Sequence, residues 1–484
     1  MRQQRHIHIP IPWSKRILAA AVAACAVIVG LSLPVGDILA DQRETPSFQL
    51  PRYEKFKLQN GLTVYLMEQH QVPLIYVSAL FPAGAVKDCD KPGLAYLTAE
   101  ALLFGTWSYR KAQIEDRLEF LGARYYSYAN LETAGVSVSF MSTDLDQVLP
   151  LFKEVIQNPT FDPGEFEKRK KRLLLELAQE KERPSAVLDT YFNKFLFGPH
   201  GYGNPIYGTR ASVQKIGSRD AKAFYEAHYR PEDSALVIVG DFQTGPMKRR
   251  VQELFSFWKS AGKLSPSERG LLPAHDRSRI LLVNKSDSTE TQFAFGGLGI
   301  PRNHPDYVAV RVVNTVLGGR FTSLLNDALR VSAGLTYGAS SSFNTYRDSG
   351  SFVVSSFTST ENTFKAVDLA LAVLNRIHAE GVDEETLTSA KAYLIGQFPT
   401  SYETPGSLAS LLASMFFYGF DETFVSEYRK RVEGVTVEKT RELIARHFPR
   451  DRLQFVLIGK ALELRDRAGN YGELYEKEIK SDRF

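Results

Sequence analysis

Hydrophobic and polar positions along this chain change period repeatedly, which predicts an alternation of strands and helices. The runs GLTVYLM (61–67) and LIYVSALF (74–81) predict successive strands joined by a turn. The stretch GLAYLTAEALLFGT (93–106) predicts the start of an amphipathic helix and the residues just after it.

The pattern also repeats. Residues 161–198 pair without a gap with residues 382–419, so that Asp162 meets Asp383 and Gly198 meets Gly419. Upstream, FMSTD pairs with FTSTE, and each follows a strand-like run (AGVSVSF or SGSFVVSSF). Each also precedes a long run with helical spacing. Two matches at nearly the same offset predict two copies of one structural unit.

We therefore expect an α+β fold of two homologous α/β domains. Each has a mixed, mostly antiparallel sheet with helices packed on one face. The expected boundaries are a leader at 1–40, an N-terminal domain at 41–258, a linker at 259–279 and a C-terminal domain at 280–484. A doubly wound parallel sheet is the alternative, and it is disfavoured because no strand is followed by a glycine-rich phosphate turn.

The N-terminus has the order of a secretory signal. Basic residues precede an apolar run at 17–35, and Ala40 is a plausible last residue before cleavage. An uncleaved membrane anchor and lipidation at Cys25 remain alternatives. In each case we expect the body of the chain outside the cytoplasm, periplasmic or otherwise exported.

Composition excludes some functions. With 59 basic and 55 acidic residues, the chain gives no electrostatic reason to expect nucleic acid as a partner. Cys25 lies in the leader and Cys89 is alone in the rest, so we expect no internal disulfide and no cysteine metal cluster. No two histidines after the leader lie within five residues of each other. A local histidine pair therefore cannot start a zinc site.

Five stretches carry a family resemblance: NGLTVYLMEQHQVPLIYVSALFPAGA, GLAYLTAEALLFGT, HGYGNPIYGT, FYEAHYRPEDSALVIVGDF and RVSAGLTYGASSSF. Their order and spacing resemble the pitrilysin/insulinase-type metallopeptidases. The chain is most similar to the two-domain bacterial members related to mitochondrial processing peptidase. The resemblance implies the mitochondrial-processing-peptidase/LuxS-like fold in both halves.

Active members of that family carry His-x-x-Glu-His on a helix, with a further glutamate downstream as third zinc ligand. In register, Tyr96 stands at the first histidine, Ala99 at the general base and Glu100 at the second histidine, while Glu176 matches the downstream glutamate. A phenol is a poor zinc ligand and alanine can move no proton. We expect this zinc site to be lost. Glu100 and Glu176 are left to hold a hard cation, to be solvated, or to pair with Lys or Arg.

The segment LNDALRVSAGLTYGASSSF resembles one through which non-catalytic subunits of this family supply an Arg and a Tyr to a partner's site. Here those residues are Arg330 and Tyr337. The pattern predicts a helix at 321–334, ending near Gly334, and a strand from 335. Alternatively, Arg330 stabilises the helix C-terminus and Tyr337 is an ordinary half-buried strand residue.

The resemblance implies a non-catalytic subunit of a heteromeric zinc metallopeptidase. It holds no cofactor itself, and zinc is expected in a homologous partner chain. The expected substrate is a peptide or unfolded protein, and membrane contact is expected only if the leader stays uncleaved. A catalytically dead scaffold or peptide-binding protein is the second hypothesis, and an independent peptidase with a rebuilt site is the third.

Overall fold

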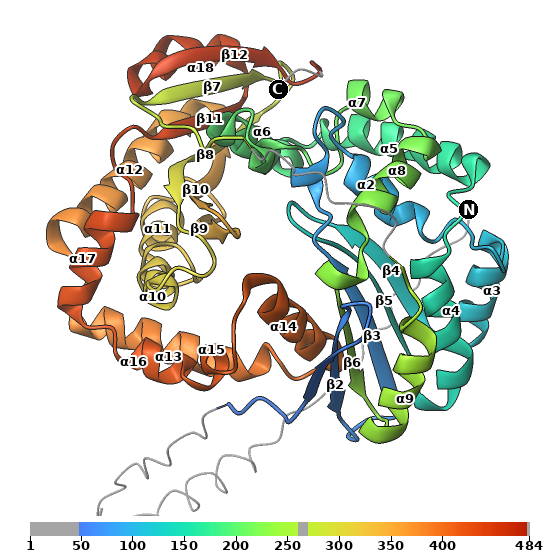
Figure 1. Ribbon diagram of the computed structural model, residues 1–484. Coiled ribbons are helices and arrows are strands. Elements are labelled where there is room, and N and C mark those ends of the chain that lie inside the picture. The colour runs from blue at the N-terminus through green and yellow to red at the C-terminus, as the bar shows by residue number, and fades with distance from the viewer. Residues whose placement is uncertain (1–47, 260–269, 482–484) are drawn as a thin grey trace, which may run out of the picture. The chain divides into compact units, whose positions relative to one another are not determined.

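Twelve strands form two six-stranded sheets in the computed structural model, which describes residues 48–259 and 270–481 (Figure 1). The first sheet has the order β1-β2-β6-β3-β5-β4 and the second β12-β7-β11-β8-β10-β9. The strands of the first sheet are β1 (Glu54–Lys57), β2 (Thr63–Glu68), β3 (Leu74–Phe81), β4 (Arg124–Ala129), β5 (Ala134–Met141) and β6 (Ala235–Gly240). Those of the second are β7 (Arg279–Asn284), β8 (Glu290–Gly299), β9 (Ala339–Thr345), β10 (Gly350–Ser359), β11 (Gln454–Gly459) and β12 (Glu473–Glu478).

Both sheets are mixed and mainly antiparallel, which confirms the expected fold class. In the first sheet only β2 and β6 are parallel. In the second, β7 pairs in parallel with both β11 and β12. The predicted strands at 61–67 and 74–81 exist as β2 and β3, but they do not pair, because β6 lies between them. The apolar run ALVIVG of β6 is buried along its whole length, as a central strand requires.

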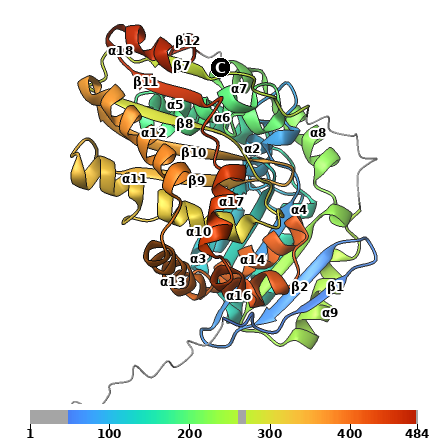
Figure 2. The same ribbon diagram turned by 90° about the vertical axis from the view of Figure 1, so that its left-hand side faces the viewer.

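Helices pack against the sheets in both halves. Those of the first half are α2 (Leu94–Ala101), α3 (Lys111–Phe120), α4 (Leu145–Gln157), α5 (Pro163–Glu180), α6 (Pro184–Phe197), α7 (Arg210–Lys215), α8 (Ser218–His228) and α9 (Thr244–Phe255). Those of the second are α10 (Tyr307–Leu317), α11 (Leu324–Asn326), α12 (Thr363–Glu380), α13 (Glu384–Thr400), α14 (Pro405–Tyr418), α15 (Thr423–Ser426), α16 (Tyr428–Glu433), α17 (Val437–His447) and α18 (Ala461–Ala468). Figure 2 looks onto the second half, where α12 packs on β10.

The internal repeat of the sequence reappears as equivalent helix pairs. Helix α5 begins at Asp162, whose Oδ1 accepts a backbone N–H at 2.9 Å, and α13 begins at Asp383, whose Oδ1 accepts one at 2.8 Å. Helices α6 and α14 follow, and each starts with a proline, which is favourable in a first helical turn. Similar capping chemistry thus sets the same two helices in both halves.

These repeated helices pack across the molecule. Helix α6 of the first half packs on β8 and β11, whereas α14 of the second half packs on β3 and β6 (Figure 1). Leu188 and Phe192 of α6 share a buried cluster with Val456 of β11. Each sheet therefore carries its own helices on one face, as expected, and a helix from the other half on the opposite face. The sequence did not predict this exchange.

Two sequence predictions fall wholly or partly outside the described residues. The predicted leader at 1–40 lies outside them, as do residues 260–269 of the predicted linker. Residues 270–278 of that linker form neither helix nor strand. In the part of the chain that the structure describes, no helix is long and apolar enough to span a membrane.

Candidate functional site

Helix α2 carries three of the positions that the sequence singled out. It begins after Gly93, whose φ of +97° is strained for any residue with a side chain. The buried carboxylate of Asp88 accepts the backbone N–H of Gly93 at 2.8 Å and that of Ala95 at 2.7 Å. Burial raises the pKa of Asp88 well above its usual range. The Gly93 conformation and the Asp88 hydrogen bonds together fix the first turn of α2. This turn in turn sets the directions in which Tyr96, Ala99 and Glu100 point.

A single guanidinium joins the residues at the former zinc-ligand positions. Arg169 of α5 donates from Nε to Glu100 Oε2 at 2.9 Å and from Nη1 to Glu176 Oε2 at 3.0 Å. Its Nη2 donates to the hydroxyl of Tyr96. The Arg169 side chain is 8% exposed. Of the alternatives for Glu100 and Glu176, the structure therefore has both paired with an arginine.

Charge complementarity holds this cluster together. Burial by itself lowers the pKa of Arg169, but the Glu100 hydrogen bond and the charges of Tyr96, Glu100 and Glu176 outweigh it and raise that pKa. Burial, together with the Glu100 charge, raises the pKa of Tyr96 to about 12. At neutral pH the cluster is accordingly a guanidinium cation bound to a neutral phenol.

These residues do not fit a catalytic zinc ion. The positions that correspond to ligands offer no imidazole, and both carboxylates are already bound to Arg169. A metal ion would have to displace a buried cation whose three nitrogens each donate a hydrogen bond. Ala99, at the position of the general base, is completely buried in the apolar core of the first half. It offers no group that could accept a proton from water.

Arg330 and Tyr337 lie on either side of a helix end in the second half. The predicted helix at 321–334 is shorter than expected: α11 covers Leu324–Asn326 and continues as a π-helical segment, Asp327–Ser332. Gly334 follows with φ +63°, as expected for a left-handed cap. The predicted strand begins later, as β9, so Tyr337 lies in the connecting loop and not in a strand. π-Helical turns are uncommon and concentrate at functional sites.

Both side chains line a cleft of about 640 Å³. The Tyr337 residue is 83% exposed, and the Arg330 guanidinium lies 4.5 Å from the ring centre of Phe321. Among the described residues, Arg330 makes no ion pair and the Tyr337 hydroxyl makes no hydrogen bond. The opposite wall comes from α6 and includes Asp189, whose pKa is raised by burial. None of Tyr96, Glu100 and Glu176 lines this cleft.

A tight turn forms another part of the wall. The backbone N–H groups of Gly318 and Gly319 both donate to the carbonyl of Asn314, at 2.9 and 2.8 Å. A Cβ on Gly318 would lie 2.3 Å from the backbone nitrogen of Ser341. The glycine pair therefore makes a closely packed turn, and this close packing argues against a flexible gating loop.

Sequence reasoning missed Arg169 and Phe321. Arg169 lies in the charged run EFEKRKKRLLLELAQE, which resembles a solvated helix face. Its seven-residue spacing from Glu176 is close to two helical turns and places both side chains on one face. That spacing was the available signal. Nothing in the sequence indicated that Phe321 packs against Arg330.

Comparison with known families matches most of the chain. Residues 63–210 match the family described as "Insulinase (Peptidase family M16)". Residues 215–394 match the one described as "Peptidase M16 inactive domain". The two matches follow each other along the chain: the first lies within the first half of the fold, and the second begins at the end of α7 in the first half and extends into α13 of the second.

Individual proteins agree with this assignment. The chain is 24% identical over 405 residues to the "Non-peptidase homolog YmxG" of Helicobacter pylori, which covers 83% of this chain and 92% of that protein. It is 20% identical to the "Uncharacterized zinc protease YmxG" of Bacillus subtilis, over 74% of this chain and 86% of that protein. A crystal structure described as the peptidase M16 inactive domain from Pseudomonas fluorescens superposes with a TM-score of 0.78 at 25% identity. It covers 84% of this chain and 98% of that one.

Proposed function

Because the chain belongs to the M16 peptidase family but lacks that family's zinc ligands and general base, we propose that it is the non-catalytic subunit of a heteromeric zinc peptidase. In this proposal the zinc is bound by a second, homologous chain, and Arg330 and Tyr337 of this chain contact the substrate there. The observation that carries the proposal is a contrast. All three guanidinium nitrogens of Arg169 are hydrogen-bonded within this chain, whereas in the described part of the chain Arg330 makes no ion pair and the Tyr337 hydroxyl no hydrogen bond, and both face an open cleft.

The loss of catalysis in cis follows from the residues themselves. A zinc peptidase needs a metal-bound water and a base that takes its proton. This chain has a guanidinium among the residues at the ligand positions and a buried alanine at the base position. Losing a general base alone typically costs about 10²- to 10⁴-fold in rate. The missing metal removes the nucleophile as well.

The chemistry that remains suits transition-state stabilisation. A guanidinium and a phenol are hydrogen-bond donors, and peptide hydrolysis places negative charge on the carbonyl oxygen. Arg330 has no carboxylate partner to give up among the described residues, so it can turn toward that oxygen without breaking an ion pair. Each well-placed donor of this kind typically contributes about 10²- to 10³-fold in rate.

The substrate class follows from the edge strand beside the cleft. Strand β9 is at one end of the second sheet and pairs only with β10. Ser340 lies on β9 and also lines the cleft with Tyr337. An extended peptide can add to such an edge through backbone hydrogen bonds, which demand little of its sequence. We therefore propose peptides or unfolded segments of proteins as the substrate.

Reconstitution tests this proposal. The purified chain is assayed on a generic unfolded protein substrate, alone and mixed with the homologous chain from the same source that carries His-x-x-Glu-His. We expect no cleavage by the chain alone and chelator-sensitive cleavage on mixing, with co-elution in size-exclusion chromatography. Zinc-dependent cleavage by the chain alone, or full activity of the partner without it, would overturn the proposal.

A second candidate function is favoured by a separate cavity. This cavity of about 700 Å³ lies between α5, α6 and β9 and is lined mainly by nonpolar surface. In the described part of the chain, the buried Oδ1 of Asn193 on its wall has no hydrogen-bond partner. A catalytically dead peptide-binding protein could use such a cavity without any zinc-bearing partner. Micromolar peptide binding by the isolated chain, lost in Asn193→Leu, together with no effect on peptidase activity, would favour this role.

A further inference from the structure

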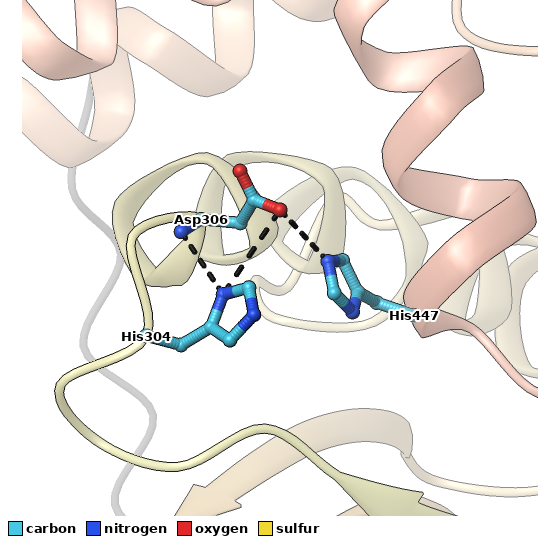
Figure 3. A group of neighbouring side chains, drawn as sticks. All are labelled: His304, Asp306 and His447. Carbon is cyan, nitrogen blue, oxygen red and sulfur yellow. Dashed lines mark hydrogen bonds and ion pairs between the residues drawn. The ribbon is translucent and has the colours of Figure 1, made fainter.

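Three metal-ligating side chains meet in the second half, away from both groups described above. His304 lies in the segment between β8 and α10, Asp306 is the residue before α10, and His447 is the last residue of α17. Figure 3 shows the three side chains pointing toward one another. In the described residues they are the one group of at least three His, Cys, Asp or Glu residues with ligand atoms close enough for a metal ion.

The distances are close to those of a metal site. His447 Nε2 lies 2.9 Å from Asp306 Oδ2, and His304 Nδ1 lies 4.0 Å from the same oxygen. One ligand atom from each residue falls within 4.8 Å of the others. A tetrahedral zinc ion with bonds of about 2.0–2.2 Å separates its ligand atoms by roughly 3.3–3.6 Å, a value between the two observed distances.

We propose that His304, Asp306 and His447 bind a first-row divalent transition metal of the zinc class. Two imidazoles and one carboxylate are donors that suit Zn²⁺, Co²⁺ and Ni²⁺ better than the all-oxygen preference of Ca²⁺ or Mg²⁺. The His447 side chain is 8% exposed and that of His304 is 29% exposed. The site is therefore embedded in the protein but open on the His304 side, where an ion can enter and water can complete its coordination.

The Asp306 carboxylate does not cap the helix that follows it, although it precedes α10. Residues that precede a helix commonly use a side-chain oxygen to cap its first N–H groups. Asp306 makes no such bond to α10, and its Oδ2 instead accepts from His447 Nε2. This orientation directs the carboxylate toward α17. A bound ion would tie the end of α17 to the start of α10, two segments that are far apart in sequence.

Four existing interactions compete with the ion, and the first is the hydrogen bond between His447 Nε2 and Asp306 Oδ2, which binding through those two atoms would replace. The backbone N–H of Asp306 donates to His304 Nδ1 at 3.1 Å, so binding through that nitrogen would replace a hydrogen bond. Lys439 Nζ is 3.5 Å from Asp306 Oδ1, and Arg446 Nη1 is 3.7 Å from Oδ2. Both cations also pair with Glu442, each at 3.1 Å. Glu442 can keep them when the metal takes Asp306.

Metal titration of the chelator-treated full-length chain tests the proposal. We expect Co²⁺ to give the visible absorption of a tetrahedral site with a nitrogen and oxygen donor set. We also expect Zn²⁺ to raise the melting temperature and to displace Co²⁺. Because His6 and His8 also offer imidazoles, comparison with variants is decisive and metal stoichiometry alone is not. The site is independent of Arg330 and Tyr337, so its failure would leave the proposed function untouched.

The variants are Asp306→Asn and His447→Ala, with His378→Ala as the matched control. His378 bonds through Nε2 to the carbonyl of Phe448 at 2.9 Å and is not part of the group. Loss of a ligand should weaken binding by at least about 10-fold, since losing even an outer-shell partner typically costs this much. His378→Ala should bind as the wild type does. Absence of the Co²⁺ absorption in the wild type, or equal binding by all three variants, would overturn the proposal. If one variant fails to fold, the other still tests the site, and absence of the Co²⁺ absorption in the wild type overturns the proposal in any case.

Discussion

Arg169 lies beside the residues at the former zinc-ligand positions, and Arg330 lies at the position proposed to contact substrate. The first is buried among hydrogen-bond acceptors, and the second faces a cleft. Arg169 is buried and uses three nitrogens to bind Glu100, Glu176 and Tyr96. Arg330 faces a cleft and, within the described residues, contacts only the ring of Phe321 among charged or aromatic partners. A saturated guanidinium contributes to the fold, whereas an unpaired one remains available for a ligand. Under the proposed function, it is therefore the second half of the chain that contacts the substrate.

The strongest test is to rebuild the metal ligands with and without Arg169. Tyr96→His/Glu100→His restores two imidazoles that can act with Glu176. We expect zinc to bind roughly 10²- to 10⁴-fold more tightly when Arg169→Ala is added, because displacing a buried paired charge costs about 3–5 kcal/mol. Competition titration with a zinc-sensitive dye measures the difference.

The matched control for this experiment replaces Arg169→Ala by Arg172→Ala. Arg172 lies on the same helix, its side chain is 68% exposed, and its Nε is 3.8 Å from Glu176 Oε1. It should not change zinc affinity. Neither zinc-binding variant should cleave peptides, because Ala99 still provides no base. If the zinc affinity is the same with and without Arg169, the guanidinium does not compete with the metal ion for this position.

The next largest effect concerns the exposed arginine. In the reconstituted complex, Arg330→Ala should lower kcat by about 10²- to 10³-fold, with Tyr337→Phe lowering it in the same direction. Both changes should alter the melting temperature little, because among the described residues Arg330 makes no ion pair, with only a ring contact to Phe321, and the Tyr337 hydroxyl makes no hydrogen bond. Steady-state kinetics and thermal denaturation measure the two quantities. Arg376→Ala on α12 and Tyr475→Phe on β12 are controls on exposed residues outside the cleft. Unchanged kcat in Arg330→Ala would remove the assigned role.

At Arg169, by contrast, we expect the substitution to lower stability. Arg169→Ala should lower the free energy of unfolding by about 2 kcal/mol, because it leaves two carboxylates and a phenol without their donor. The loss is smaller than for a fully buried pair, since Glu100 and Glu176 are partly exposed. Urea denaturation measures it, with Arg172→Ala as the nearly neutral reference. A stable Arg169→Ala protein would mean that water replaces the guanidinium at little cost.

The smallest expected effect is a difference between Tyr96 and Tyr337 in how they contribute to the free energy of unfolding at alkaline pH. The folded-state pKa of Tyr96, about 12, lies above the ordinary value near 10. Its stabilising contribution is therefore fully present below pH 10 and is lost as pH rises from about 10 to 12. Since Tyr96 is only partly buried, we expect about 1 kcal/mol. The difference in unfolding free energy between wild type and Tyr96→Phe should change over this pH range. Tyr337→Phe, at an exposed position, serves as the reference. If the difference between wild type and Tyr96→Phe does not depend on pH, the pKa of Tyr96 is not raised in the folded state.

Much of the fold was predictable because local patterns reported it. Alternating apolar residues gave β2, β3, β5 and β10, and the duplicated Asp and Pro caps gave the paired helices of the two halves. The neighbours of each strand were not predictable. That β6 lies between β2 and β3 depends on a pairing across most of the first half, which no local pattern records.

The residues of the candidate site were likewise predictable only in part. Tyr96, Ala99 and Glu100 could be identified from the sequence because a helical motif has fixed spacing. The partner of the two glutamates could not be assigned. Arg169 is one of several basic residues on α5, and only packing against α2 distinguishes it from exposed Arg172. The meeting of His304 and Asp306 with His447, far along the chain, likewise arises from tertiary contacts.

By itself, the sequence determined that this is a duplicated α+β chain of the M16 type whose catalytic motif has lost its imidazoles and its base. These are statements about residue identity and short-range spacing. Only the tertiary structure decided that a guanidinium occupies the cluster and that, among the described residues, Arg330 has no carboxylate partner and Tyr337 no hydrogen bond. It also decided that α6 and α14 each pack on the sheet of the other half. The physical reason is that ion pairing and burial depend on which side chains approach in space, and those approaches join residues far apart in the chain.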